Sequence, residues 1–386
     1  MIRQDVCIRG AGAVGLALAL ALARQGLRVA LVEPAAAPPR GPDLRAYALN
    51  AASRALLQSL KVWDALPPAA VTPVHDMQVQ GDDAGALLDF SAWQQGAEAL
   101  AWIVDAAALD QALATAARFA PHLERRSEAA PAAVADLQDS ALTVLAEGKA
   151  SATRAALGVG WTQHAYGQSA VAARLVADAP HQGVARQWFR APDVLALLPL
   201  DAAAPGCGHG LVWSLPTEQA RHWLQAPLAD FEQALNQATG GAAGQLRLLA
   251  GDDAAAPAGG RAAWPLSLGR ADRLCGPGWA LVGDAAHVVH PLAGQGLNLG
   301  LADVAALARV IAEREAWRGL GDELLLRRYE RERAGATAAM AWVTDGLLQL
   351  FAQPQPLLRE LRNRGMTLLN HLPPVKRLLT ARALDL

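Results

Sequence analysis

Apolar residues near the N-terminus form two short runs that flank a longer one. The short runs are Val6 to Ile8 and Arg28 to Val32, and the long uncharged run extends from Val14 to Ala23. Short apolar runs bounded by turn residues are typical of buried parallel strands, whereas ten apolar residues in succession have the length of a helix. Arg24-Gln25-Gly26 then supplies a helix-ending signal. The pattern predicts strand, helix and strand.

A glycine motif lies between the first predicted strand and the helix. Gly10, Gly12 and Gly15 form G-x-G-x-x-G, and Glu33 follows 18 residues after Gly15. In such a unit Gly10 permits a tight turn, Gly12 lets a pyrophosphate approach the backbone, and Gly15 allows close helix packing. Helix amides from Ala13 onward face the phosphates, and the acid accepts hydrogen bonds from an adenosine ribose. These features favour a dinucleotide site over a secretory signal, but they do not separate NAD from FAD.

A second strand, loop and helix are predicted between residues 278 and 311. Ala280 to Val282 is a short apolar run that ends in Gly283-Asp284, and helical periodicity begins at Leu297. An aspartate at the end of a strand can bind a polyol hydroxyl, and the glycines of Gly294-Gln295-Gly296 let a flat ring lie against the backbone. The helix would direct its positive end at the ring.

The middle of the chain predicts a different sheet. Residues 169–177, 184–189, 194–200 and 210–216 form strand-like runs separated by Gly/Pro turns, without helices between these runs. This order favours a mostly antiparallel sheet that would cover a substrate. Trp188 and Trp213 are candidates for an aromatic substrate pocket, although large aromatic residues more often belong to the core.

Composition and charge narrow the class of protein. The chain has 386 residues, is 53% hydrophobic and carries a formal charge of −2, which suits a two-domain globular enzyme and gives no reason to expect a nucleic-acid partner. No uncharged apolar run reaches the roughly 18 residues of a spanning helix. Three scattered cysteines fit a cytoplasmic location. His287 and His290 form H-x-x-H without a third ligand, so we expect no metal site.

Together these motifs resemble those of a known family. The N-terminal glycines, "DLRAYALN" (43–50) and "GDAAHVVHPLAGQGLNLGLAD" (283–303) are similar to single-component flavin monooxygenases of the para-hydroxybenzoate hydroxylase group. Within that group, "SRALLQSLKVWDAL" (53–66), "AAWPLSL" (262–268) and "LPPVKRLL" (372–379) resemble the ubiquinone-biosynthesis hydroxylases over almost the whole chain. The resemblance implies an α/β fold with a Rossmann-like FAD-binding domain and parallel sheet, a mostly antiparallel substrate domain and C-terminal helices.

The resemblance also implies a cofactor, a reaction and site residues. FAD would be reduced by NAD(P)H and would use O2 to hydroxylate an aromatic ring, such as that of a polyprenylated quinone precursor. Pro291 and Leu292 would form the wall beside flavin C4a. The residues expected to bind FAD are Gly10, Gly12, Ala13, Val14, Gly15, Glu33, Arg45, Gly283, Asp284, Gly294, Gln295, Gly296, Leu297 and Asn298.

Two positions depart from the pattern of the family. The family has an Asp-Gly pair after a strand, but "AALGVG" (155–160), which we interpret as that strand, continues into Trp161 without the pair. Ala106 occupies a position where a polar side chain would reach toward FAD. Both departures leave open a second reading, in which the protein is a flavin-binding accessory or non-catalytic subunit of a quinone-biosynthesis assembly. A hydroxylase of a soluble aromatic compound is a third.

The expected domain order follows the same resemblance. Residues 351–386 carry six Lys/Arg against Glu360 and Asp385, with leucines at helical spacing, so a basic tail could contact the inner membrane or a partner protein. The expected segments are an FAD-binding domain of 1–75, 101–161 and 269–345, an excursion into the substrate domain at 76–100, the substrate domain at 162–268, and a helical tail at 346–386.

Overall fold

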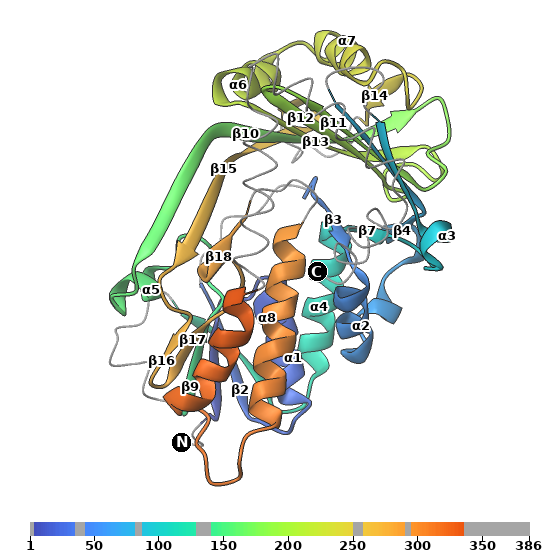
Figure 1. The fold of residues 1–386 in the computed structure, drawn as a ribbon. Coiled ribbons are helices and arrows are strands. Elements are labelled where there is room, and N and C mark those ends of the chain that lie inside the picture. The colour runs from blue at the N-terminus through green and yellow to red at the C-terminus, as the bar shows by residue number, and fades with distance from the viewer. Residues whose placement is uncertain are drawn as a thin grey trace.

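Two large sheets, a small third sheet and the helices that cover them make up the described part of the protein, seen here in a computed structural model (Figure 1). The structure describes residues 4–34, 43–81, 87–128, 140–249, 258–289 and 295–335. The tail expected at 346–386 lies outside these ranges, as do Pro291, Leu292 and Gly294. Within the described ranges, no helix is both long and apolar enough to cross a membrane.

The first sheet is mainly parallel and has the order β16-β17-β9-β1-β2-β8. All of its pairings are parallel except that of β16 with β17. Its strands come from three separate stretches of the chain, and they are β1 (Val6–Arg9), β2 (Val29–Pro34), β8 (Leu123–Glu128), β9 (Leu142–Leu145), β16 (Cys275–Gly276) and β17 (Trp279–Leu281). The parallel sheet expected for the FAD-binding part is therefore confirmed.

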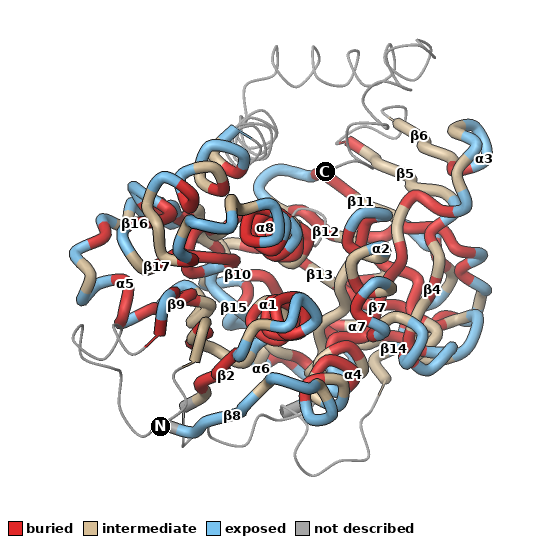
Figure 2. Tube along the Cα trace, turned by 90° about the horizontal axis from the view of Figure 1, so that it is seen from below, coloured by how far each residue is buried: buried red, intermediate tan, exposed pale blue. Residues whose placement is uncertain are grey.

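Three helices cover one face of this sheet. Helix α1 (Ala13–Ala23) lies between α8 (Gln295–Ala312) and α4 (Ala106–Phe119), as Figure 1 shows. Every residue of α1 from Gly15 to Ala23 is buried, which appears as the red central tube of Figure 2. A helix that is apolar all round is stable only when it is enclosed on every side. The uncharged run that resembled an export signal is thus a core helix.

The second sheet is mainly antiparallel, as the middle of the sequence predicts. Its order is β18-β15-β10-β13-β12-β11-β5-β6, and β14 also pairs with β10. The exception is the parallel pair of β11 with β5. The strands are β5 (Asp76–Gln80), β6 (Leu87–Ser91), β10 (Trp161–Ala177), β11 (Val184–Arg190), β12 (Asp193–Pro199), β13 (Gly208–Pro216), β14 (Leu246–Leu248), β15 (Arg261–Ala271) and β18 (His287–Val288).

The long strands β10 and β15 run from the parallel sheet up to the second one (Figure 1). Helices α6 (Thr217–Gln225) and α7 (Leu228–Thr239) cover the outer face of the second sheet. A core of apolar side chains, including Val171, Leu195, Phe231 and Leu235, fills the space between sheet and helices. The inner face of the second sheet, which α6 and α7 do not cover, is directed toward the parallel sheet.

A small third sheet connects the two layers. It has the order β3-β7-β4, formed by β3 (Ala46–Leu49), β7 (Ala101–Asp105) and β4 (Val71–Val74). Helices α2 (Ala51–Ser59) and α3 (Ala92–Gln95) lie in the same part of the chain. Asn50 caps α2 by accepting a hydrogen bond from the Ser53 amide, and Asp105 caps α4 through the Ala108 amide. Strand β3 is therefore held directly beside the first turns of two helices.

The prediction of a strand at 155–160 is wrong. Residues of that stretch belong to α5 (Ala152–Ala156) and to the turn that follows it. The strand that joins the parallel sheet is β9, which pairs with β1 on one side and β17 on the other. Both stretches are short and apolar, and such runs do not distinguish strand from helix until their partners are known.

Asp193, at the start of β12, provides a test of the second layer. Asp193 is partly buried beside the indole of Trp213, and its buried Oδ1 has no hydrogen-bond partner. Desolvation by burial raises the pKa of Asp193 to about 6. Because a carboxyl with a raised pKa binds its proton more tightly in the folded state, stability falls as the pH rises from about 4 through 6.

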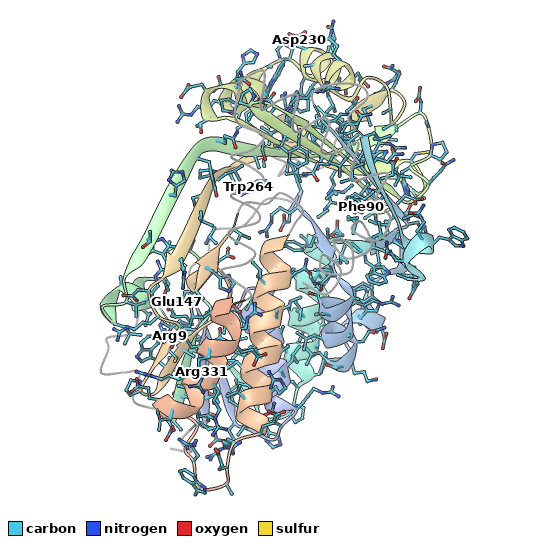
Figure 3. The ribbon with its side chains drawn as sticks, viewed as in Figure 1. Arg9, Phe90, Glu147, Asp230, Trp264 and Arg331 are labelled. Carbon is cyan, nitrogen blue, oxygen red and sulfur yellow. The ribbon has the colours of Figure 1, made fainter. Side chains whose placement is uncertain are left out.

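We therefore expect Asp193→Asn to raise the melting temperature at neutral pH by a few degrees, and to have no effect near the pH at which both forms are uncharged. Thermal unfolding followed by circular dichroism across this pH range measures the difference. Asp230, which is exposed on α7 (Figure 3), provides the matched control Asp230→Asn. An Asp193→Asn protein that melts with the wild type at every pH would contradict this account.

Candidate functional site

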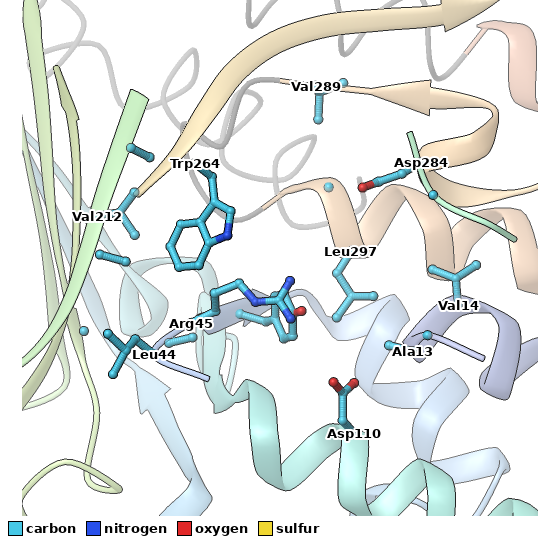
Figure 4. A pocket seen from close by; sticks show the side chains of 18 of the residues that line it. Ala13, Val14, Leu44, Arg45, Asp110, Val212, Trp264, Asp284, Val289 and Leu297 are labelled. Atoms are coloured by element: carbon cyan, nitrogen blue, oxygen red, sulfur yellow. The ribbon is translucent and has the colours of Figure 1, made fainter. Parts of the chain in front are cut away.

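A cavity of about 450 Å³ lies between the two layers. One side is formed by the first turns of α1 and α8, with Asp284 between them, and the opposite side by the inner face of the second sheet (Figure 4). Arg45 and Tyr47 of the β3 region and Asp110 of α4 complete the wall. The size is that of a typical ligand site, and the wall combines apolar surface with a few charged groups.

The three N-terminal glycines have different surroundings. Gly10 has φ +110°, and a Cβ there would lie 2.3 Å from the Ala146 carbonyl oxygen of the neighbouring strand end. A Cβ on Gly15 would lie 1.9 Å from the Gly10 oxygen, so only glycine lets α1 approach β1 this closely. A Cβ on Gly12 would meet nothing within 4 Å, because Gly12 faces the cavity. The amide end of α1 is thus open to a ligand.

An acid and a glycine do follow a strand of the parallel sheet. They are Glu147-Gly148, directly after β9 and Ala146, rather than after residues 155–160. Gly148 and Ala146 line the cavity. The expectation that the Asp-Gly pair is missing therefore rested on the wrong stretch as the preceding strand. After β9 the position is present, with glutamate in place of aspartate.

Glu147 links this turn to its neighbours. Its carboxylate accepts hydrogen bonds from Arg9 Nε at 3.2 Å, Ser151 Oγ at 2.6 Å and Thr153 Oγ1 at 2.7 Å. Figure 3 shows Arg9 and Glu147 side by side at the ends of their strands. Glu147 therefore fixes the β9 turn to β1 and to the start of α5, leaving the glycine beside it to face the cavity.

Asp284 lies in the one-turn helix η5 (Gly283–Ala285) and faces the cavity (Figure 4). The side chain is accessible from the cavity although protein surrounds it on its other sides. Burial raises the pKa of Asp284, and the charges of His287, Lys149 and Arg45 oppose that rise. A carboxyl placed at a strand end in this way can accept hydrogen bonds from the hydroxyls of a bound polyol.

Arg45 is held in place by its neighbour in sequence. Its Nε and Nη2 donate to the two oxygens of Asp43 at 2.9 and 2.6 Å, and its guanidinium lies 5.5 Å from the Tyr47 ring centre. Hydrogen bonding to Asp43 raises the pKa of Arg45, and burial raises the pKa of Tyr47 to about 12. The cavity wall therefore carries a fixed cation and a neutral phenol. From the opposite layer, Arg174 of β10 forms an ion pair with Asp105 at 2.5 Å, beside the same wall.

Several predicted site residues line the cavity and others do not. Those that line it are Gly12, Ala13, Val14, Gly15, Arg45, Asp284, Gly296 and Leu297. Gly10 and Gly283 support the wall from behind, Gln295 begins α8, and Glu33 is bound by Arg125 of β8 at 2.9 Å. Asn298 is buried and bonds instead to Ala48, Asn50 and Ser53, so it joins α8 to β3 and α2. Pro291, Leu292, Gly294 and His290 lie outside the described residues.

The two tryptophans predicted for the substrate pocket belong to the outer core. Trp188 and Trp213 pack with the side chains under α6 and α7, where Trp213 stacks on Trp223. The aromatic residue that lines the cavity is Trp264 of β15, which projects inward near Val212 (Figure 4). Apolar residues line both faces of this sheet. Alternation along a strand therefore predicts which residues share a face, but it does not predict which face meets the cavity.

Ala106 proves to be buried at the first turn of α4 and contributes no polar group. One turn further along the same helix, Asp110 lines the cavity. Sequence reasoning missed Asp110, although residues four apart on a helix share a face.

The residues that line the cavity fit FAD. The Gly12 backbone leaves space for a phosphate beside the amide end of α1, and Asp284 offers acceptor oxygens in the cavity that Gly296 of α8 also lines. Among the described residues, no group of three or more His, Cys, Asp or Glu is placed to bind a metal ion. His287 instead bonds to Asp303 at 2.7 Å.

Comparison with known proteins agrees with this fit. Residues 3–343 match the family described as FAD binding domain. The chain belongs to the family of FAD-dependent hydroxylases. Its relatives include the ubiquinone hydroxylase UbiL of Rhodospirillum rubrum, 32% identical over 98% of this chain and 89% of that protein. The 3-demethoxyubiquinol 3-hydroxylase of Escherichia coli is 30% identical over 94% of this chain and 93% of its own.

Solved structures of other proteins have the same fold as this chain. PqsL from Pseudomonas aeruginosa, titled a probable FAD-dependent monooxygenase, has a TM-score of 0.73 at 23% identity and covers 94% of this chain and 99% of its own. The p-nitrophenol 4-monooxygenase PnpA from Pseudomonas putida has a TM-score of 0.74 at 18% identity and covers 99% and 98%. The predicted fold class and the resemblance to the ubiquinone-biosynthesis hydroxylases are confirmed.

Two glycine substitutions should separate binding from folding. Gly12→Ala adds a methyl group that only a bound phosphate would meet, so we expect FAD affinity to fall about tenfold or more while the apoprotein melts as the wild type does. Gly15→Ala forces α1 away from β1 and should destabilise the apoprotein by about 1–3 kcal/mol.

Flavin fluorescence titration and thermal unfolding measure the two effects. Gly319, where a Cβ would meet nothing within 4 Å, supplies the control Gly319→Ala. Equal losses of stability in the Gly12 and Gly15 variants would show that the division of roles is incorrect.

Proposed function

We propose that the protein hydroxylates the aromatic ring of a polyprenylated phenol or quinone precursor, with FAD bound in the cavity and NAD(P)H and O2 as co-substrates. The observation that carries the proposal is the cavity itself, because one side offers a dinucleotide cradle and the other an apolar chamber. The names of its relatives, UbiL and 3-demethoxyubiquinol 3-hydroxylase, support the substrate class. The bound flavin would supply electron transfer and oxygen activation.

The cofactor side of the proposed site is built from backbone and one acid. The α1 amide end at Gly12 and Ala13 would hold the pyrophosphate, with Glu33 near the adenosine and Asp284 on the ribityl chain. Arg125 donates hydrogen bonds to both carboxylate oxygens of Glu33 and would thereby orient this acid toward the adenosine. The α8 amide end at Gly296 would face the flavin ring and stabilise negative charge on it.

The substrate side is apolar and lined by small residues. Ala170, Ala172, Ala196 and Gly210 of the second sheet leave room, and Trp264 projects between them and the cofactor side. We propose that the substrate ring packs on Trp264, because an indole offers a flat apolar surface to an aromatic ring. The apolar wall would exclude water from the reacting groups.

A flavin-binding accessory subunit is the second candidate, and Ala106 is the observation that favours it. The missing Asp-Gly pair no longer supports this alternative, since Glu147-Gly148 occupies that place. A catalytic protein should consume NAD(P)H faster when its aromatic substrate is added, whereas an accessory subunit should not.

The purified wild type should be yellow, and Asp284→Ala should lose bound flavin because no other cavity carboxylate is described beside η5. Absorbance spectra and NAD(P)H oxidation with and without a prenylated phenol are the measurements. Asp230→Ala, which removes an exposed acid of α7 away from the cavity lining, is a control for loss of an acid. A colourless wild type that does not bind added FAD would refute the proposal.

Gly210 allows the tail of the substrate to be tested separately from its ring. A Cβ there would lie 3.4 Å from Ala46 Cβ, an ordinary contact, so Gly210→Val should fold while narrowing the cavity between β13 and β3. We expect KM for a prenylated phenol to rise about tenfold and KM for the tail-free phenol to stay unchanged. If Gly210→Val changed KM by the same factor for both phenols, the result would favour a substrate without a prenyl tail. The contact of the C-terminal segment 346–386 with a membrane is a separate prediction, and this segment lies outside the described residues.

A further inference from the structure

A buried network of charges lies behind the turn that carries Asp284. Asp303 of α8 is fully buried, and its Oδ2 accepts hydrogen bonds from the Gly283 amide at 2.8 Å and from His287 Nε2 at 2.7 Å. Its Oδ1 accepts a bond from Arg333 Nε at 2.6 Å. One carboxylate therefore joins the η5 turn, strand β18 and the helix 323–335 to α8.

Arg333 extends the network along the helices. Its Nη2 also donates to the Leu299 carbonyl at 3.3 Å, in the first turns of α8. The helix 323–335 is tied to the parallel sheet as well, because Tyr329 donates its hydroxyl proton to the Leu281 carbonyl at 2.7 Å. The helix 323–335 therefore holds the strand end before η5 directly, through Tyr329, and holds Asp303, the acceptor for Gly283, through Arg333.

The backbone at Gly283 depends on this support. Gly283 has φ +60°, and a Cβ there would lie 3.2 Å from the Val14 side chain of α1. The Gly283 amide is directed at Asp303, so the next residue, Asp284, is turned toward the cavity. Loss of the Asp303 acceptor would leave a buried amide without its partner and free the turn to rotate.

We propose that Asp303, His287 and Arg333 are positioning residues for the cofactor, which fix the direction of Asp284 and balance its negative charge. This inference rests on the proposed FAD site. The charged groups around His287 are Asp303 from α8, Arg333 from the helix 323–335, Asp284 from η5 and Arg270, its register partner on β15. When His287 is protonated, it and Arg333 together balance the two carboxylates.

The protonation of His287 gives this balance a pH dependence. Burial by itself would lower the pKa of His287, but the adjacent Asp303 carboxylate outweighs burial and raises it. The charge is therefore present below the ordinary histidine range and is lost as the pH rises through the raised value. Above that value the network gains one net negative charge next to a site for an anionic pyrophosphate. FAD affinity should fall accordingly.

The test compares wild type with His287→Gln, whose amide can still donate to Asp303 but cannot carry charge. Apoprotein is titrated with FAD at about pH 6, where His287 is protonated, and at the highest pH at which the apoprotein remains folded. The wild type should bind about tenfold more tightly than the variant at the lower pH, and this ratio should fall at the higher pH as His287 loses its proton. Glu332→Gln, in the same helix as Arg333 but on its exposed side, should match the wild type at both.

A second variant tests the hydrogen bonds themselves. Asp303→Asn should weaken FAD binding about tenfold or more at both pH values, because two buried cations lose their acceptor charge. Circular dichroism of the apoprotein shows whether this variant folds, and His287→Gln decides the question if it does not. A constant ratio of wild-type to His287→Gln affinity would overturn the inference while leaving the FAD site intact. A wild type that binds no FAD would overturn the proposed function and the inference together.

Discussion

The close approach of α1 to the ends of β1 and β9 is the constraint on which the site depends. Gly10 and Gly15 bring helix and strand within a distance that no side chain would allow. This contact directs the amide end of α1 into the cavity, and it places Gly12 where a ligand can reach the backbone. The amide end of α8 and Asp284 then meet it from the other side. Two helix amide ends therefore offer donors to an anion in one cavity, and Asp284 offers acceptors to hydroxyl groups there.

The second sheet adds selectivity to this surface. Its outer face is sealed by α6 and α7, so its inner face is free to meet the cofactor side. Small residues on that face make room, and Trp264 occupies part of it. The Arg174–Asp105 ion pair joins β10 to the start of α4, and thus holds the two sides of the cavity together where the chain changes layers. A large cavity with few charges suits an apolar aromatic substrate.

Charge is handled differently on the two sides of the cofactor surface. Around Asp284 the charges are buried and paired, since Asp303 accepts from both His287 and Arg333. Around Arg45 they are partly accessible and local in sequence, since Asp43 is the partner. A buried carboxylate with three donors cannot rearrange without leaving a polar group unpaired. The η5 turn is therefore held by more buried hydrogen bonds than the wall around Arg45.

The sequence alone determined the parallel sheet, the close packing at Gly10 and Gly15 and the antiparallel second sheet, because these depend on local spacing and on the two periodicities of helix and strand. It could not determine that β9 rather than 155–160 enters the sheet, since both are short apolar runs and only pairing with β1 distinguishes them. Nor could it show that Trp264 faces the cavity while Trp188 and Trp213 face the helices, because both faces of that sheet are covered. Asn298 and Arg333 acquired their roles only through partners far away in the chain. Such contacts are decided by tertiary packing, which a local pattern does not contain.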